Sequence, residues 1–283
     1  MNRLQSLLRI AKLMPMLVAG LLLCLPLTAQ PTEQSPVDIS RSNTVRNPNR
    51  PQIDFNYGIA GVTLKNTYGS KDETGRTLAR EWGTLKASIP DAQPVLWLNG
   101  VAYDLVQFHF HTPSEHTING RHTEMEIHVV HLIHDNQGGA AACATSNRPL
   151  VVLGALIDPG SSDKELQRLF PAGLPRTNTD PPAEISNVDL RAALLPSGNP
   201  IWHYDGGLTA PANDCPAFEP LSTQAVTGNF PEAVHWYLYD KKLHLPQDLI
   251  DRFKSLFPDG NSRTVKALGD RKIYFFNRQN GDE

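Results

Sequence analysis

The 283-residue sequence lacks several features that would mark common protein classes. It has no excess of basic residues, because its formal net charge is -3. No basic stripe is apparent, which argues against nucleic acid as a partner. No internal repeat is apparent either. The apolar run from Met14 to Leu27 is shorter than the roughly 20 residues that a membrane-spanning helix needs, so we expect no stable membrane insertion.

The N-terminal segment has the composition of a secretory signal peptide. Three basic residues precede the apolar run and Thr-Ala-Gln follows it, so cleavage near Ala29 is expected. We therefore predict a signal peptide at residues 1–29, with an uncleaved anchor as the alternative, and an exported protein that is periplasmic or secreted by a bacterium. The remainder, residues 30–283, fits one large β-rich domain.

Cysteine is also scarce. Of the three cysteines, Cys24 lies within the predicted signal peptide, and only Cys143 and Cys215 remain in the mature chain. In an exported protein a disulfide between these two is expected. The chain-entropy model gives such a bridge a stabilisation of about 4 kcal/mol, less any strain. Two free thiols are the alternative.

The sequence does contain two stretches in which histidine alternates with apolar residues. They are Gln107–His116 (QFHFHTPSEH) and Glu126–His131 (EIHVVH). Because alternate side chains of a strand share a face, His109 and His111 would lie side by side, and an antiparallel neighbour would bring His128 beside them. Three neutral imidazoles with a fourth position open are the donor set of a catalytic Zn²⁺ site.

Other histidines of the same region are interpreted differently. His131 has the wrong parity to be a ligand, and His116, His122 and His134 are interpreted as structural or surface residues. An ordinary core or surface histidine is the alternative for the ligands too. A metal-ligand face, however, explains why polar side chains alternate so regularly with Phe, Ile and Val.

These stretches resemble the metal-binding hairpin of the α-class carbonic anhydrases, especially their bacterial branch. Four further segments resemble that family in the same order: Gln34–Ile39 (QSPVDI), Ile201–Pro211 (IWHYDGGLTAP), Val234–Trp236 (VHW) and Asn261–Ile273, which holds N-x-R and R-x-I. The resemblance implies a mainly β fold with short helices. It also implies a large, twisted, mostly antiparallel central sheet with the zinc site at the base of a funnel.

The resemblance implies roles for individual polar residues. His109, His111 and His128 would bind Zn²⁺. Two neighbours on the strands, Gln107 and Glu126, would fix the rings of His109 and His128 by hydrogen bonds.

The same resemblance implies the groups around the substrate. Thr209 would accept a hydrogen bond from the zinc-bound hydroxide and pass its own proton toward Glu115, and Tyr204 would hydrogen-bond near that threonine. An apolar wall would hold carbon dioxide, and its members would be Val130, Leu150, Val152, Leu208 and Trp236.

The implied activity is the reversible hydration of carbon dioxide to bicarbonate and a proton. Carbon dioxide is small and apolar, so it requires an apolar pocket and a strong nucleophile. Zinc supplies that nucleophile by acidifying water, a property of which carbonic anhydrase is the standard example. One alternative is a non-catalytic binding module of the same family. Another is a cupin metalloenzyme, because His109, His111 and Glu115 fit half of that motif, although the second half, Pro196–Gly198 with His203, has the wrong spacing.

Departures from the family pattern concern the rim of the site. Residues Asn213–Pro231 are rich in Pro, Ala, Ser and Thr and predict a long loop over the rim. The segment Leu64–Gly69 stands where relatives carry the proton-shuttle histidine, so no shuttle residue is predicted. His203 and His235 alternate away from the presumed pocket.

Local patterns also predict some secondary structure. Short apolar or alternating segments predict strands at Val95–Leu98, Leu150–Leu156 and Lys272–Phe276. A helix is predicted at Ser162–Phe170, which begins with Ser and Asp. Another is predicted at Pro246–Phe257, with Pro in the first turn and with Leu249, Phe253 and Leu256 on one stripe.

Overall fold

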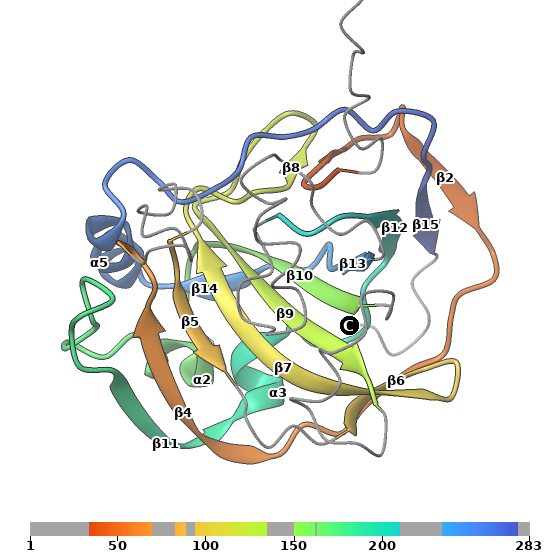
Figure 1. The fold of residues 1–283 in the computed structure, drawn as a ribbon. Helices are drawn as coiled ribbons and strands as arrows, with labels where there is room; N and C mark the ends of the chain where they lie inside the picture. Colours follow the sequence, from red (N-terminus) through yellow and green to blue (C-terminus); the bar gives the residue numbers. More distant parts are fainter. Residues whose placement is uncertain are drawn as a thin grey trace, which may run out of the picture. The chain divides into compact units, whose positions relative to one another are not determined.

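The computed structural model describes residues 34–69, 83–88, 94–134, 150–161, 163–209 and 234–276. They belong to one compact unit, Pro31–Glu283, and most of them lie in or between strands (Figure 1). Thirteen of the described strands form one sheet. Its main path runs in the order β11 (Ala183–Asp189), β4 (Ile59–Asn66), β5 (Leu85–Ser88), β7 (Val101–His111), β9 (Met125–Ile133), β10 (Leu150–Pro159), β13 (Val234–Leu238), β12 (Trp202–Gly206), β15 (Ile273–Phe276) and β2 (Thr44–Asn47).

The remaining strands attach to the sides of this path. β3 (Ile53–Phe55) pairs with β6 (Pro94–Leu98), which also pairs with β7, and β14 (Leu243–Leu245) pairs with β10. β1 (Asp38–Ile39) and β8 (Thr117–Ile118) form a separate two-stranded sheet. Most pairs of the large sheet are antiparallel, and β13 and β14 run parallel to β10. The predicted fold class is confirmed, and β6, β10 and β15 cover the three predicted strands to within three residues.

A β-bulge sets which side chains of β7 face the site. The pairing of β7 with β9 shifts between Leu105 and Gln107, so that Leu105 opposes His131 but Gln107 opposes Val130. An extra residue in one strand reverses the alternation beyond it. Leu105 and Phe108 therefore pack in the same apolar cluster although they are three positions apart. Gln107 and the histidines that follow it are turned to the other face.

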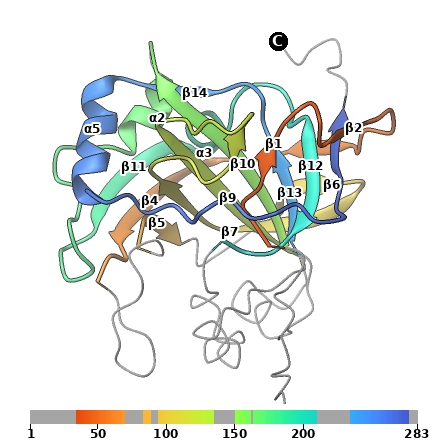
Figure 2. The ribbon, with the colours of Figure 1, turned by 90° about the horizontal axis from the view of Figure 1, so that it is seen from above.

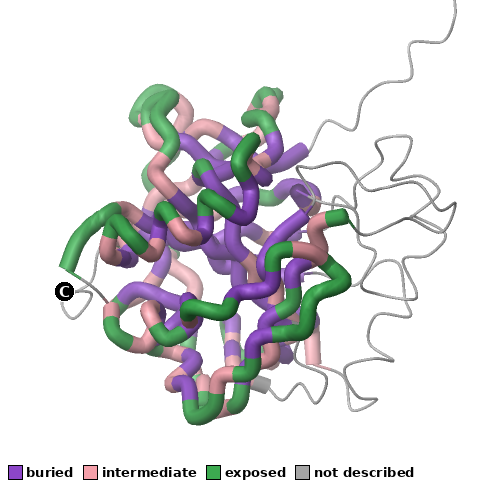
Figure 3. Tube along the Cα trace, turned by 90° about the vertical axis from the view of Figure 1, so that its left-hand side faces the viewer, coloured by how far each residue is buried: buried purple, intermediate pink, exposed green. Residues whose placement is uncertain are grey.

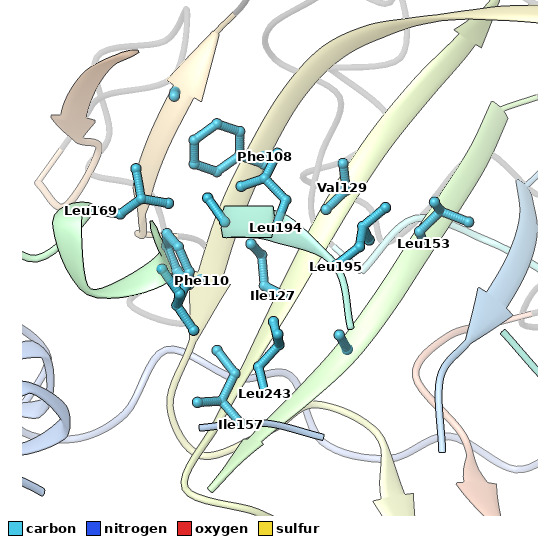
Figure 4. Close-up of a cluster of buried hydrophobic side chains, with 14 of the residues drawn as sticks. Phe108, Phe110, Ile127, Val129, Leu153, Ile157, Leu169, Leu194, Leu195 and Leu243 are labelled. Atoms are coloured by element: carbon cyan, nitrogen blue, oxygen red, sulfur yellow. The ribbon is translucent and has the colours of Figure 1, made fainter. Parts of the chain in front are cut away.

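Two apolar clusters pack on opposite faces of the central strands. The main cluster contains Phe108, Phe110, Ile127 and Val129 (Figure 4). The smaller cluster contains the residues that alternate with these on β9 and β10, such as Val130 and Val152. Eight of the nine residues of β9 are buried, as a strand covered on both faces requires. Figure 3 shows this buried centre, with the exposed turns outside it.

Figure 2 shows three short helices. Their apolar side chains pack into the main cluster. The helices are α2 (Lys164–Arg168), α3 (Leu190–Leu194) and α5 (Gln247–Leu256). The prediction of α5 is confirmed to within one residue at each end. The predicted stripe was partly wrong, since Ile250 is fully buried and Leu249 is only partly buried. Among the described residues, no helix is long and apolar enough to cross a membrane.

The other two helices differ from the prediction. α2 ends two residues early, because Leu169 and Phe170 make tighter i to i+3 bonds before Pro171, which disfavours a helical residue ahead of it. α3 was not predicted. It begins after Asp189, whose carboxylate accepts a hydrogen bond from the Ala192 N–H at 3.1 Å.

Candidate metal centre

Three histidines meet on the face of β7 and β9 opposite the main cluster. His109 and His111 alternate along β7, and the strand register places His128 directly opposite His109. The centroids of the three rings are 4.7–5.2 Å apart. One nitrogen from each ring lies within 4.8 Å of the other two. We call these three residues the histidine triad.

Each ring of the triad is oriented through its other nitrogen. His109 Nδ1 lies 2.7 Å from Gln107 Oε1, His111 Nδ1 donates to the Asn261 carbonyl at 3.0 Å, and His128 Nε2 donates to Glu126 Oε1 at 2.9 Å. These partners leave one nitrogen of each ring for another contact. His111 Nε2 and His128 Nδ1 are buried and have no hydrogen-bond partner among the described residues. Buried polar atoms are normally satisfied, so these two nitrogens fit a metal ion as their missing partner.

The surroundings favour neutral rings at two of the three positions. Burial lowers the pKa of His109 well below its usual range, with contributions from His111, His128 and Lys86. Burial also lowers the pKa of His111. At His128 burial acts in the same direction but is outweighed by Glu126, which raises the pKa, so a metal would displace a proton there.

Glu126 connects the triad to a buried chain of hydrogen bonds. Its Oε1 lies 2.7 Å from His116 Nδ1, its Oε2 accepts the His116 N–H at 2.8 Å, and His116 Nε2 lies 2.7 Å from the Tyr204 hydroxyl. Tyr204 in turn donates to Ser35 Oγ at 2.9 Å. Burial opposes ionisation of Glu126, yet His116 and His128 hold its pKa well below its usual range. His116 is thus fully buried and holds Glu126, which in turn holds His128. The sequence context of His116 did not reveal this role.

The structure brings Glu115 close to the triad but does not join it to Thr209. Glu115 Oε1 accepts the Arg263 main-chain N–H at 2.8 Å, and Glu115 Oε2 lies 3.8 Å from His128 Nδ1. Glu115 Oε2 is buried and has no hydrogen-bond partner among the described residues. Thr209 is buried and is the last described residue before the gap that ends at residue 233. The relay between these two side chains stays a prediction.

The five residues predicted as an apolar wall lie together. Val130, Leu150, Val152 and Trp236 are buried in the smaller cluster, and Leu208 packs against it. The ring of Trp236 has its centroid 4.8 Å from that of His128, and its Nε1–H donates to the Gly207 carbonyl at 3.0 Å. An apolar surface therefore adjoins the triad.

Some residues of the centre were not assigned a role from the sequence. Asn261 holds His111 through its carbonyl, and its side chain also binds the Thr112 N–H at 2.7 Å. Lys86 lies opposite His109 across the β5–β7 pair. Asn261 belonged to the recognised N-x-R motif, so its position carried a signal. Lys86 carried none, because only the strand register brings it to the triad.

The remaining predicted positions are distributed as follows. His122 is exposed, and His134 binds the buried Asp104 at 2.8 Å. His203 and His235 lie on the sheet face away from Tyr204 and Trp236. On that face the ring of His203 stacks on the ring of Tyr237. Cys143, Cys215 and the predicted loop 213–231 lie outside the described residues.

His131 lies on the face of β9 opposite the triad, as its parity predicted. It is fully buried, it contacts the Tyr57 hydroxyl, and its Nδ1 lies 3.2 Å from the Val151 carbonyl. Burial lowers the pKa of His131 to about 4. In the unfolded chain a histidine has a pKa of about 6.5, so the unfolded chain binds more protons below that pH. His131 therefore contributes full stability above about pH 6.5 and loses it as the pH falls toward 4.

We expect this loss to reach about 3 kcal/mol in the free energy of unfolding. Urea denaturation of the metal-free wild type and of His131→Gln, each at pH 7.5 and pH 4.5, measures it. The wild type should lose more stability between the two pH values than the variant does. An equal loss in both proteins would show that His131 is not the group responsible.

Comparison with known proteins decides the family. The family model described as eukaryotic-type carbonic anhydrase matches residues 25–215. The chain belongs to this family. A carbonic anhydrase of Klebsiella pneumoniae is 32% identical over 85% of this chain and 78% of its own length. The predicted family is therefore confirmed, and membership contradicts the cupin alternative.

Solved carbonic anhydrase structures share the fold. The α-carbonic anhydrase of Thermovibrio ammonificans in complex with the inhibitor sulfanilamide matches with a TM-score of 0.64 and 24% identity, covering 86% of this chain and 87% of that one. The α-carbonic anhydrase of Photobacterium profundum gives a TM-score of 0.63 with 22% identity, over 87% and 90% of the two chains. At these identities the likeness concerns the fold alone.

Proposed function

We propose that this carbonic anhydrase family member catalyses the reversible, zinc-dependent hydration of carbon dioxide to bicarbonate and a proton. The observation that carries the proposal is the triad, with two buried nitrogens that lack a partner and an apolar cluster beside them. Zinc held by His109, His111 and His128 would supply a strong nucleophile at neutral pH by acidifying water.

The chain's own residues would then prepare the site. Gln107, Asn261 and Glu126 hold the three rings so that the free nitrogens converge. Such partners fix the ring orientation and raise ligand basicity. Glu126 is itself held by His116, so the ring of His128 has little freedom to turn.

The substrate would be held by apolar contact. Carbon dioxide has no charge for the protein to clamp, and the surface beside His128 is formed by Trp236 and its apolar neighbours. Thr209 would accept a hydrogen bond from the attacking oxygen and donate its own to Glu115, which would aim an oxygen lone pair at the substrate carbon. A preorganised contact of this kind accelerates a reaction because it is made before the transition state is reached.

The direct test is a stopped-flow hydration assay on zinc-loaded protein, with metal content measured on the same sample. Hydration that requires zinc and is blocked by sulfanilamide, the inhibitor bound in the Thermovibrio relative, would support the proposal. Stoichiometric zinc without hydration would instead favour the non-catalytic binding module.

Export and the cysteine bridge also remain proposals. We infer a signal peptide at residues 1–29 from its charge and apolar pattern, and hence a periplasmic or secreted protein. A bridge between Cys143 and Cys215 would suit that oxidising location.

Proton export should limit turnover, because no shuttle histidine was found in the segment Leu64–Gly69. Tyr68 is no substitute, since its ring packs edge-on against Phe257, 6.2 Å away in the main cluster. Imidazole has a pKa matched to neutral pH. Imidazole buffer should therefore raise the maximal hydration rate in a saturable manner, by up to the ~10²-fold that one acid-base group typically contributes.

Thr67→His should reduce this dependence on buffer. Leu64 in β4 and Tyr68 just beyond the strand pack in the main cluster, and the Thr67 N–H continues the pairing with β5 by donating to the Thr84 carbonyl. Continued alternation therefore directs Thr67 to the face of the triad. Tyr68→His, which faces the main cluster, is the matched control and should retain the dependence. Fast turnover of the wild type in dilute buffer, unaffected by imidazole, would show that another residue carries the proton.

A further inference from the structure

A second group of metal-ligating side chains lies on the opposite face of the sheet from the triad. His203 and Asp205 share a face of β12, and His235 stands directly opposite Asp205 on β13. β12 and β13 are neighbours in the sheet (Figure 1). The residues that alternate with these three, Tyr204 and Trp236, pack in the smaller cluster beside the triad. The same alternation therefore turns the second group away from the carbonic anhydrase site.

The donor atoms of this group are already close together. Asp205 Oδ1 lies 2.6 Å from His235 Nδ1 and 3.6 Å from His203 Nε2. One donor atom from each residue lies within 4.8 Å of the other two, as in the triad. Nitrogen and oxygen ligands about 2.1 Å from a tetrahedral ion stand about 3.4 Å from one another. Small side-chain rotations would therefore suffice to enclose an ion.

His203 is oriented as a ligand would be. Its Nδ1–H donates to the Trp236 carbonyl at 3.0 Å, and because a carbonyl only accepts, the lone pair is left on Nε2, toward Asp205. Metal-binding histidines commonly donate their other N–H to a backbone carbonyl in this way. The ring stacks on Tyr237 with centroids 4.4 Å apart, which restricts its rotation. Burial lowers the pKa of His203, which favours the neutral, ligating ring.

The group is also open to solvent on one side. The side chains of Asp205 and His235 are 56% and 40% exposed, whereas that of His203 is 15% exposed. A hydrated ion could reach the carboxylate and exchange some of its waters for protein ligands. Arg271 donates to the main-chain oxygen of Asp205 at 3.1 Å. The carboxylate oxygen Oδ1 lies near both histidines.

We propose that His203, Asp205 and His235 form a surface site for a divalent transition-metal ion such as Zn²⁺, Ni²⁺ or Cu²⁺, with water completing the coordination. Two imidazoles and one carboxylate suit these ions, whereas Ca²⁺ and Mg²⁺ prefer oxygen ligands alone. Binding would displace the proton that His235 shares with Asp205. A bound ion would connect β12 to β13 on the face opposite the apolar wall.

The site can be tested on tag-free protein that carries one zinc ion per chain. Titration with NiCl₂, followed by calorimetry and by NMR of the histidine rings, should reveal one further ion per chain. Paramagnetic Ni²⁺ should broaden the ring signals of His203 and His235. Cu²⁺ should bind the same site more tightly than Ni²⁺.

Two surface substitutions should remove the further ion. His235→Ala and Asp205→Asn should each lower its affinity by more than the ~10–100-fold typical of losing an orienting partner. His134→Gln is the matched control, because His134 also pairs with an aspartate, Asp104, but belongs to no group of three metal-ligating side chains among the described residues. It should leave the further ion in place.

The opposite results would overturn the proposal. If the wild type takes up no further ion, or if His235→Ala and Asp205→Asn both retain it, the group is an ion pair only. His128→Ala separates this question from the triad. It should remove the first ion and leave the Ni²⁺ broadening of His203 and His235 unchanged.

Discussion

Purified His128→Ala protein is expected to contain no stoichiometric zinc. Catalytic zinc sites commonly use three protein ligands, and this substitution leaves two. His128 Nδ1 is buried without a hydrogen-bond partner among the described residues, so its position fits contact with a metal ion. Elemental analysis after dialysis measures the zinc that remains bound. The zinc affinity should fall by more than ~100-fold. His109→Ala and His111→Ala should behave alike.

The matched control lies three residues along the same strand. His131→Ala removes an imidazole from the opposite face of β9, where it contacts Tyr57, and folded protein should keep its zinc. Retention of one zinc per chain by His128→Ala would show that the ligand assignment is wrong.

The Thr209→Ala variant should retain zinc and lose about 10²–10³-fold in the rate of carbon dioxide hydration, the range typical of deleting one preorganised donor. The proposed role of Thr209 is to orient the attacking oxygen through Glu115, whose Oε2 is buried and has no hydrogen-bond partner among the described residues. Stopped-flow hydration at matched zinc content measures the effect.

A conservative substitution separates orientation from packing at this position. Thr209→Ser keeps the hydroxyl and should recover most of the lost rate. A wild-type rate in Thr209→Ala would remove Thr209 from the mechanism.

The sequence could predict the triad because its geometry is local to one hairpin. Alternation on β7 places His109 beside His111, and an antiparallel register is enough to add His128. The alternation on β7 has a period of two residues, which a single sequence displays directly. The apolar wall was implied by the family resemblance, and the structure places four of its members on β9, β10 and β13.

Other contacts join residues that are distant in the sequence, so their pairing could not be predicted. Asn261 reaches His111 across 150 positions, and Lys86 faces His109 only through strand pairing. The bulge between Leu105 and Gln107 was also hidden, because the adjacent apolar residues Leu105 and Val106 do not mark a break in the alternation. α3 was missed because five residues show too little periodicity to identify a helix.

The contacts of Arg263 bear on how the protein reaches its native state. This arginine donates to the Ser35 carbonyl at 2.8 Å, 228 positions away, while its main-chain N–H holds Glu115. Arg271 similarly binds the Gln34 carbonyl across 237 positions. Because the chain is synthesised from its N-terminus, it cannot complete the site until nearly all of its residues have been added. Contacts of such sequence separation slow folding, so the nascent chain remains open for longer, which would suit the proposed export.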